Sequence, residues 1–241
     1  MLYRRWGAGV VTLPNSTIFV TGGQNSSGTA KPMLDTTEMF DGTSWTRGPD
    51  MPVALTQHCM ALLPDGDVLI SGGWPNGRLD DSAHFGETAK TFVYSFKDGI
   101  WREKPSMSIQ RVYHACAVLN GEVWVGGSGP YGQDYEKDLV GSTEIYNHQT
   151  ETWRPGPDLP YTVLIAGEFV SNEGRLFYIG GYGDSEGKQI HQLNDNQDGW
   201  IFVSDFHSTN PISHRILSCF RLHPWPSWPT WLTTQGVKSF L

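Results

Sequence analysis

The sequence predicts an all-β propeller of about four blades, each blade a sheet of four antiparallel strands. Two observations carry this prediction. A glycine pair closes a short apolar, β-rich run four times, and the pairs recur about every 50 residues, a period typical of propeller blades. The same succession of residue types then follows each pair. The pairs are Gly22-Gly23, Gly72-Gly73, Gly126-Gly127 and Gly180-Gly181.

A tryptophan closes each unit, a few residues after an aromatic or aliphatic residue. We expect the glycines to permit a positive φ where blades crowd together, and the large rings to pack one blade on the next. The first three units then turn through proline, at 48–52, 105–107 and 156–160. The aromatic or aliphatic residue and the tryptophan that follows it are, in the four units, Phe40 and Trp45, Tyr94 and Trp101, Tyr146 and Trp153, and Leu193 and Trp200.

The second unit shows how a single blade is expected to fold. The apolar run 58–63 reads as an inner strand, and Asp65-Gly66 after it is a strong hairpin signal. Residues 68–71 return as the second strand, a long loop leads to a third strand at 91–94, and a tight turn leads to an outer strand around Trp101. Alternating strand directions place the long loops on one face, where binding is expected to concentrate.

This order of glycine pair, aromatic residue, tryptophan and proline turn resembles the kelch repeat across roughly residues 3–205. The resemblance implies a kelch-type propeller, with blades at about 3–52, 53–107, 108–160 and 161–205. The fourth unit lacks the proline turn, and almost nothing precedes the first. We therefore expect either an open arc of blades or a fragment of a larger propeller.

Residues 206–241 depart from the repeat. They contain no Asp or Glu and place Trp225, Trp228 and Trp231 among prolines. Because proline removes donors from a strand ladder, this segment is expected to be irregular. Two interpretations are open: a foreign terminus unrelated to the repeats, or a tail that docks on the open edge of the arc.

Composition narrows the classes of partner. The net charge is −8 and no Lys/Arg cluster interrupts the repeats, which argues against nucleic acid because such binding needs a basic face. No apolar run is long enough for a spanning helix, so no membrane partner is expected. The first residues lack the apolar stretch of a signal peptide, which favours a cytoplasmic setting.

The sequence offers no constellation for catalysis or for a metal. Cys59, Cys116 and Cys219 are too few and too far apart to predict a disulfide framework or a zinc site, and Cys59 and Cys116 are expected to pack in the core as small apolar residues. No two histidines have a usual ligand spacing. We therefore expect no cofactor, no metal and no enzyme activity. The histidines are His58, His84, His114, His148, His191, His207, His214 and His223.

The resemblance also implies a function, which is protein–protein recognition by the loop-rich face. Related proteins often serve as the substrate-binding half of an adaptor for ubiquitin ligases, although the BTB and BACK regions that carry that link are lacking here. Kelch binding faces often use arginines near the starts of inner strands, which singles out Arg5 and Arg111. The alternative is that Arg111 pairs with a neighbouring carboxylate and braces its blade.

Acidic residues gather after the glycine pairs and are further candidates for partner binding. They form either ordinary solvated loops or a negative rim that steers a basic segment of a partner. The candidates in these loops are Asp80, Asp81, Asp134 and Glu136.

Two other functions are kept open. Galactose-oxidase-like enzymes also use kelch blades, with a copper held by tyrosine and histidine and a tyrosine–cysteine crosslink, which Cys59 or Cys116 would have to supply. The chain is short for such an enzyme and lacks its paired histidines. Alternatively, the chain is an incomplete fragment without independent function, whose exposed blade faces would lead to self-association.

Overall fold

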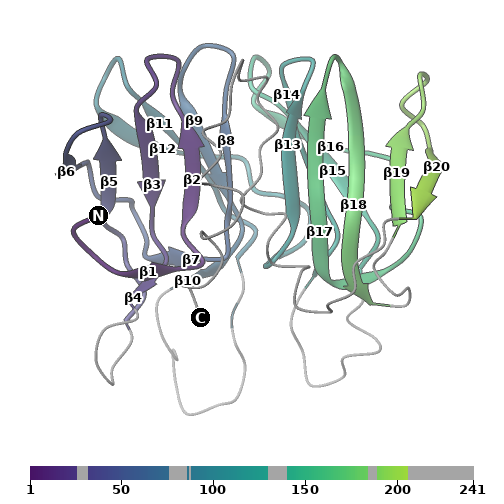
Figure 1. Ribbon diagram of the computed structural model, residues 1–241, viewed down its shortest axis with the longest axis horizontal. Coiled ribbons are helices and arrows are strands. Elements are labelled where there is room, and N and C mark those ends of the chain that lie inside the picture. The colour runs from purple at the N-terminus through teal and green to yellow at the C-terminus, as the bar shows by residue number, and fades with distance from the viewer. Residues whose placement is uncertain (26–31, 76–85, 87, 130–139, 184–188, 206–241) are drawn as a thin grey trace, which may run out of the picture.

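The computed structural model describes residues 1–25, 32–75, 86, 88–129, 140–183 and 189–205. This part of the chain consists of strands and connecting segments, without a helix, and so holds none that would be long and apolar enough to span a membrane. Four sheets of four antiparallel strands stand side by side (Figure 1). The predicted all-β propeller of four-stranded blades is confirmed.

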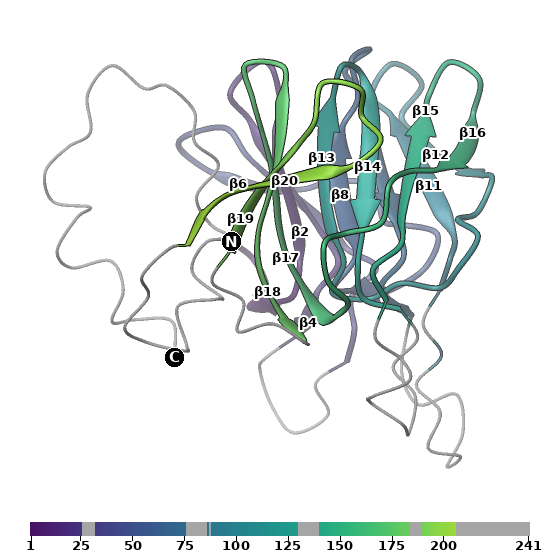
Figure 2. The same cartoon turned by 90° about the vertical axis from the view of Figure 1, so that its right-hand side faces the viewer.

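Each blade runs from an inner strand to an outer strand in chain order. Figure 2 shows this for blade 3, whose strands lead from β13 near the middle of the molecule to β16 at its edge. Blade 1 contains β2 (Gly9–Thr12), β3 (Ile18–Thr21), β5 (Thr37–Phe40) and β6 (Trp45–Arg47); blade 2 contains β8 (Cys59–Leu62), β9 (Val68–Ser71), β11 (Thr91–Ser95) and β12 (Ile100–Lys104); blade 3 contains β13 (Ala115–Leu119), β14 (Glu122–Gly126), β15 (Thr143–Asn147) and β16 (Thr152–Pro155); blade 4 contains β17 (Val163–Asn172), β18 (Arg175–Gly183), β19 (Gln189–Leu193) and β20 (Trp200–Asp205).

Two small sheets lie at one edge of blades 1 and 2. They form where the chain enters an inner strand and where it leaves the second strand of the same blade. The first pairs β1 (Arg5–Trp6) with β4 (Gln24–Asn25), and the second pairs β7 (Leu55–Thr56) with β10 (Trp74–Pro75).

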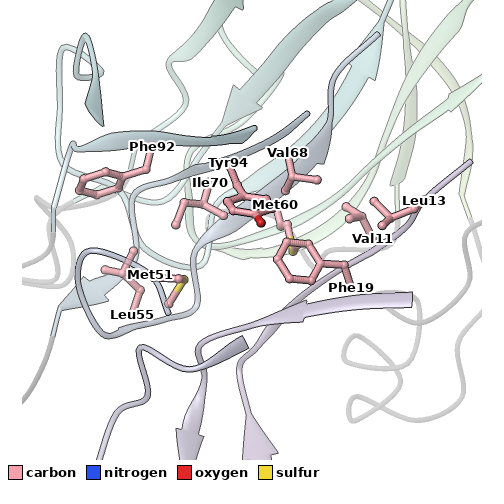
Figure 3. Packing of buried hydrophobic residues seen from close by; sticks show 10 residues of the cluster. All are labelled: Val11, Leu13, Phe19, Met51, Leu55, Met60, Val68, Ile70, Phe92 and Tyr94. Carbon is pink, nitrogen blue, oxygen red and sulfur yellow. The ribbon is translucent and has the colours of Figure 1, made fainter. Parts of the chain in front are cut away.

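The hydrophobic core is divided into layers between neighbouring blades. One cluster joins blades 1 and 2, and Figure 3 shows Phe19 of β3 beside Met60 of β8 and Tyr94 of β11 within it. A second cluster joins blades 2 and 3, and a third, around the fully buried Trp124, joins blades 3 and 4. Each blade is therefore stabilised mainly by apolar area buried against the next blade.

Tryptophans of the outer strands link each blade to the one before it. The predicted partner of each tryptophan lies directly opposite it in the sheet, as Tyr146 does to Trp153. The indole N–H then reaches back to a proline carbonyl of the preceding blade. These hydrogen bonds run from Trp101 to Pro49 (3.5 Å), from Trp153 to Pro105 (2.9 Å) and from Trp200 to Pro157 (3.3 Å).

A chain of backbone hydrogen bonds connects all four blades at the entrances to their inner strands. The amide of Gln57 donates to Gly7, that of Tyr113 to Gln57, and that of Ala166 to Tyr113, at 2.8–3.3 Å. Gly7, Gln57 and Tyr113 all have a positive φ, between 54° and 67°. These three residues are thus equivalent positions of the repeat.

The glycine pairs lie at the end of the second strand in blades 1 and 2, one residue earlier in blade 3, and inside the longer β18 in blade 4. Gly72 and Gly73 have φ values of +64° and +94°. In blade 3 the corresponding positive φ values belong to Gly127 and Ser128, because β14 extends through Gly126. The glycine pair of the sequence therefore lies one residue earlier there than the backbone feature that it marks elsewhere.

A disulfide joins Cys59 on β8 to Cys116 on β13, with their Cα atoms 5.9 Å apart. The expectation that these cysteines are simple core residues is wrong. They lie 57 residues apart in the sequence, and only the packing of two inner strands brings them together. The bond crosses the boundary between blades 2 and 3.

The inner strands contact one another in the order β2, β8, β13 and β17. Between β2 and β17 the described residues make no comparable contact. On β2, Val11 is buried against blade 2, whereas Val10, which points to the other face, is 50% exposed. Within the described residues the blades therefore form an arc.

Candidate interaction face

The candidate site is the edge of the arc where the chain enters each inner strand and leaves each second strand. We call this edge the loop face; the opposite edge, which carries the hairpin turns within each blade, is the turn face. The small sheets of β1 with β4 and β7 with β10 lie at the loop face, at the bottom of Figure 1. The long connections predicted from the sequence begin and end there.

Three aromatic residues lie on this face, and we call them the aromatic patch: Trp6, Trp74 and Tyr113. Trp6 on β1 is 40% exposed, and Trp74 and Tyr113 are partly buried. The rings of Trp74 and Tyr113 meet edge to face, with centroids 5.2 Å apart. Blades 1, 2 and 3 thus each contribute one ring.

Sequence reasoning missed the aromatic patch because its members occupy different positions of the repeat. Tyr113 lies just before the inner strand of blade 3, and the equivalent residues of blades 1 and 2 are Gly7 and Gln57. Trp74 directly follows the second glycine of blade 2. The available signal was that Tyr113 stands where the first two units carry Gly7 and Gln57, and that Trp74 stands where the first unit carries Gln24.

Arg5 points into blade 1 and is held there by several acceptors. Its Nε lies 2.8 Å from Glu38 Oε1, its Nη1 lies 2.7 Å from the carbonyls of both Gly22 and Thr36, and its Nη2 lies 2.9 Å from Thr36 Oγ1. The side chains of Arg5 and Glu38 are 1% and 0% exposed. The backbone amides of Leu2 and Tyr3 donate to the same carboxylate.

Arg111 repeats this arrangement in blade 3. Its Nη2 lies 3.0 Å from Glu144 Oε1, and its Nη1 lies 3.0 Å from the carbonyls of Gly127 and Ser142. The Arg111 side chain is fully buried. Burial lowers the pKa of its guanidinium, an effect that Glu144 opposes.

Blade 2 carries apolar residues at the positions of this ion pair. Leu55 stands where Arg5 and Arg111 stand, and Phe92 stands where Glu38 and Glu144 stand. The contacts of both arginines are those expected of residues that brace their own blade, which was the alternative interpretation for Arg111. A direct role of Arg5 or Arg111 in partner binding stays a prediction. The candidates Asp80, Asp81, Asp134 and Glu136 lie outside the described residues.

Two histidines lie at equivalent positions beside the loop face. His58 is buried, and His114 is partly buried, with both of its ring nitrogens inaccessible to solvent. His58 Nε2 lies 2.8 Å from Thr21 Oγ1 of blade 1. Burial lowers the pKa of His58 to about 4. Burial, with contributions from Arg111 and His58, lowers the pKa of His114 to about 3. Both imidazoles are therefore neutral at pH 7 and act as part of the core.

Within the described residues, no group of three or more His, Cys, Asp or Glu side chains is arranged to hold a metal ion. Both cysteines considered for a tyrosine–cysteine crosslink are bonded to each other. The described geometry therefore offers no support for the copper-enzyme alternative.

Comparison with known proteins finds similarity to several kelch proteins. No family model matches the chain. The chain is 26% identical over 174 residues to human Kelch repeat and BTB domain-containing protein 12, a match that covers 67% of this chain and 28% of that protein. It is 29% identical over 147 residues to Kelch-like protein terF of Aspergillus terreus, covering 59% of this chain and 31% of that protein. The chain thus spans less than a third of these curated relatives.

A solved structure shares the fold. The structure described as "Structure of YjhT" aligns with a TM-score of 0.68 at 15% sequence identity, covering 87% of this chain and 68% of that one. Together, the kelch relatives and the four blades support a kelch-repeat propeller that is partial relative to its longer relatives.

Proposed function

We propose that this kelch-repeat propeller is a non-catalytic interaction module whose loop face binds a protein or peptide partner. The observation that carries the proposal is the aromatic patch of Trp6, Trp74 and Tyr113. Aromatic rings are enriched at the centres of protein interfaces, where they bury large area at a small cost in side-chain entropy. Their position on three successive blades allows one partner segment to contact all three.

The charge of the chain indicates which partner suits this face. The net charge is −8, and acidic residues are frequent in the connections that start and end at the loop face. A negative rim attracts a basic segment and raises its association rate. We therefore propose a partner segment that combines apolar or aromatic residues with Lys or Arg.

The relatives favour a place within a larger assembly. Their names include BTB domain-containing and F-box/kelch-repeat proteins. We propose that the loop face acts as a substrate-recognition surface, of the kind used by ubiquitin-ligase adaptors, and that the protein works in the cytoplasm. In that compartment a disulfide such as Cys59–Cys116 is expected to be transient rather than permanent.

Selection from a random peptide library displayed on phage tests the proposal. Peptides enriched on the intact protein should be rich in basic and apolar residues. Their affinity should fall at least about tenfold with Trp6→Ala or Trp74→Ala, because truncating a central aromatic anchor typically costs more than 1 kcal/mol.

Ile100→Ala is the matched control. Ile100 is an exposed apolar residue on the outer strand β12, away from the loop face, and is 48% exposed. Its substitution should leave the affinity within about twofold, as expected of a residue outside the interface. Equal losses from Ile100→Ala and Trp6→Ala would mean that binding does not use the aromatic patch, and the proposal would be rejected.

A further inference from the structure

The Cys59–Cys116 bond lies at a place where the neighbouring blade boundary uses a hydrogen bond. Between blades 1 and 2, Thr21 Oγ1 lies 2.8 Å from His58 Nε2 and 3.3 Å from the sulfur of Met60. Thr21 ends the second strand of blade 1, Met60 lies on the inner strand of blade 2, and His58 directly precedes that inner strand. They form a noncovalent polar connection between the two blades.

At the boundary of blades 2 and 3 the equivalent residues are Ser71, His114 and Cys116. The strand registers show this equivalence, since Gly9 pairs with Thr21 just as Cys59 pairs with Ser71. In the described structure Ser71 Oγ and both ring nitrogens of His114 are buried without a hydrogen-bond partner. The covalent bond thus takes the place of the polar connection.

We propose that Cys59 and Cys116 form a redox-sensitive clasp between blades 2 and 3. In the oxidised state the disulfide fixes the spacing of β8 and β13 and leaves Ser71 and His114 without partners. In the reduced state the two thiols lie beside these groups, and an S–H is a weak donor that a neutral imidazole can accept. The boundary then has a second, noncovalent arrangement available, in which the blades move more freely.

The chemistry of the switch requires a dithiol reductant. One thiolate of the dithiol attacks a sulfur of the disulfide, forming a mixed disulfide and releasing the other cysteine as a thiolate, which takes up a proton. The second thiol of the reagent then closes its own disulfide and releases the remaining cysteine as a thiol. Two electrons and two protons pass to the protein, and the dithiol is oxidised. Cys59 is 2% exposed and Cys116 is more accessible, so attack on Cys116 is expected.

This inference concerns the blade boundary and is independent of partner binding. Within the described residues, the other two boundaries lack a disulfide and are joined by packing and hydrogen bonds alone. Reduction of the disulfide is therefore expected to loosen the boundary between blades 2 and 3 and to leave the other two boundaries unchanged. A change confined to β8, β13 and the segments that they carry would be the signature of the clasp.

The experiment uses the 241-residue chain with Cys219→Ser, so that Cys59 and Cys116 are its only cysteines. Air-oxidised protein, denatured and treated with iodoacetamide, should gain no label, and protein reduced with dithiothreitol under native conditions should gain two. Amide hydrogen exchange in β8 and β13 should be at least about threefold faster in the reduced protein, with β3 unchanged, since local opening depends on local contacts.

A matched variant replaces the cysteines with residues that other blades use at the same positions. Cys59→Ala copies Ala115, and Cys116→Val copies Val10, so the double variant is designed to fold. Its rate of amide hydrogen exchange in β8 and β13 should equal that of the reduced protein and should not change when dithiothreitol is added. Labelling of both cysteines without reductant would overturn the clasp. So would equal exchange in both redox states, or a double variant that still responds to dithiothreitol.

Discussion

The indole N–H of Trp153 donates to the carbonyl of Pro105, 2.9 Å away in the preceding blade. The same N–H lies 3.3 Å from Thr91 Oγ1 of that blade. This relationship explains why tryptophan and the proline turn recur together in the sequence. The tryptophan of one unit donates a hydrogen bond to the proline turn of the unit before it. The tryptophan and the turn that it contacts therefore belong to neighbouring blades.

Trp153→Phe should destabilise the protein more than Trp45→Phe does. Both changes shorten a ring that packs on an aromatic neighbour, but Trp45 belongs to blade 1, and within the described chain its indole has no preceding proline carbonyl. The difference should be about 1 kcal/mol, the net contribution of one hydrogen bond. Urea unfolding at constant m-value measures it. Equal losses would show that the indole hydrogen bond contributes nothing.

Gly72→Ala should be more damaging than Gly66→Ala. A Cβ on Gly72 would lie 2.6 Å from the Arg111 carbonyl and 2.7 Å from His114 Cε1, whereas a Cβ on Gly66 would meet nothing within 4 Å. Both glycines have a positive φ, +64° and +91°, so both variants suffer a backbone strain of about 1–2 kcal/mol. Gly72→Ala should lose about 2 kcal/mol more through overpacking. Similar melting temperatures would contradict the crowding at this boundary.

Arg111→Leu alone should cost about 3–5 kcal/mol, because it leaves Glu144 buried without its partner. Arg111→Leu combined with Glu144→Phe copies Leu55 and Phe92 of blade 2 and should recover most of that loss. Chemical unfolding of the two variants decides the point. A double variant as unstable as the single one would show that blade 3 depends on the ion pair in a way that blade 2 does not.

Stability should fall as the pH drops below about 6.5. His58 has a folded pKa of about 4 and His114 of about 3, whereas both have the usual value near 6.5 when unfolded. Between those values the unfolded state binds protons that the folded state does not, so stability present above pH 6.5 is lost toward pH 4. Each histidine contributes a slope of up to about 1.4 kcal/mol per pH unit.

His58→Ala places the residue of blade 1, Ala8, at the equivalent position of blade 2. Thermal unfolding followed between pH 7 and 5 should give a shallower slope for this variant than for the unchanged protein. The slope of stability against pH reports the titration of His58 alone. The loss of the hydrogen bond to Thr21 lowers stability equally at every pH and so does not change this slope. Parallel curves would mean that His58 titrates in the folded protein as it does in the unfolded chain.

The repeat made the blades predictable, because a period near 50 residues and a shared order of residue types report a structure that is itself repeated. The cross-strand pairing of Tyr94 with Trp101 follows from hairpin geometry and could be predicted from the sequence. The disulfide was not, because Cys59 and Cys116 occupy different positions of their repeats and face each other only after two blades pack. An ion pair of Arg111 was one interpretation of the sequence, but its partner Glu144 could not be identified there, since β15, which carries Glu144, lies two strands away from β13 in the sheet.

The candidate face was predictable as a location but not in its residues. Strand alternation placed the long connections on one edge, whereas Trp74 and Tyr113 meet only after blades 2 and 3 pack together. Trp6 comes from a third blade, blade 1. Arginines at the starts of inner strands attracted attention by position, and the structure places both side chains in the interior. The aromatic patch and the two arginines differ in their exposure to solvent. A sequence pattern does not report this exposure for a long side chain.

Hydrogen exchange of the intact protein, with and without a peptide selected from the phage library, tests the central claim most directly. Binding at the loop face should slow exchange in the segments 5–8, 55–58, 72–75 and 111–114, which carry the aromatic patch and its backbone supports. The hairpin turns 14–17, 64–67 and 97–99 on the turn face should be unchanged. Protection confined to those turns, with the loop face unaffected, would contradict the account.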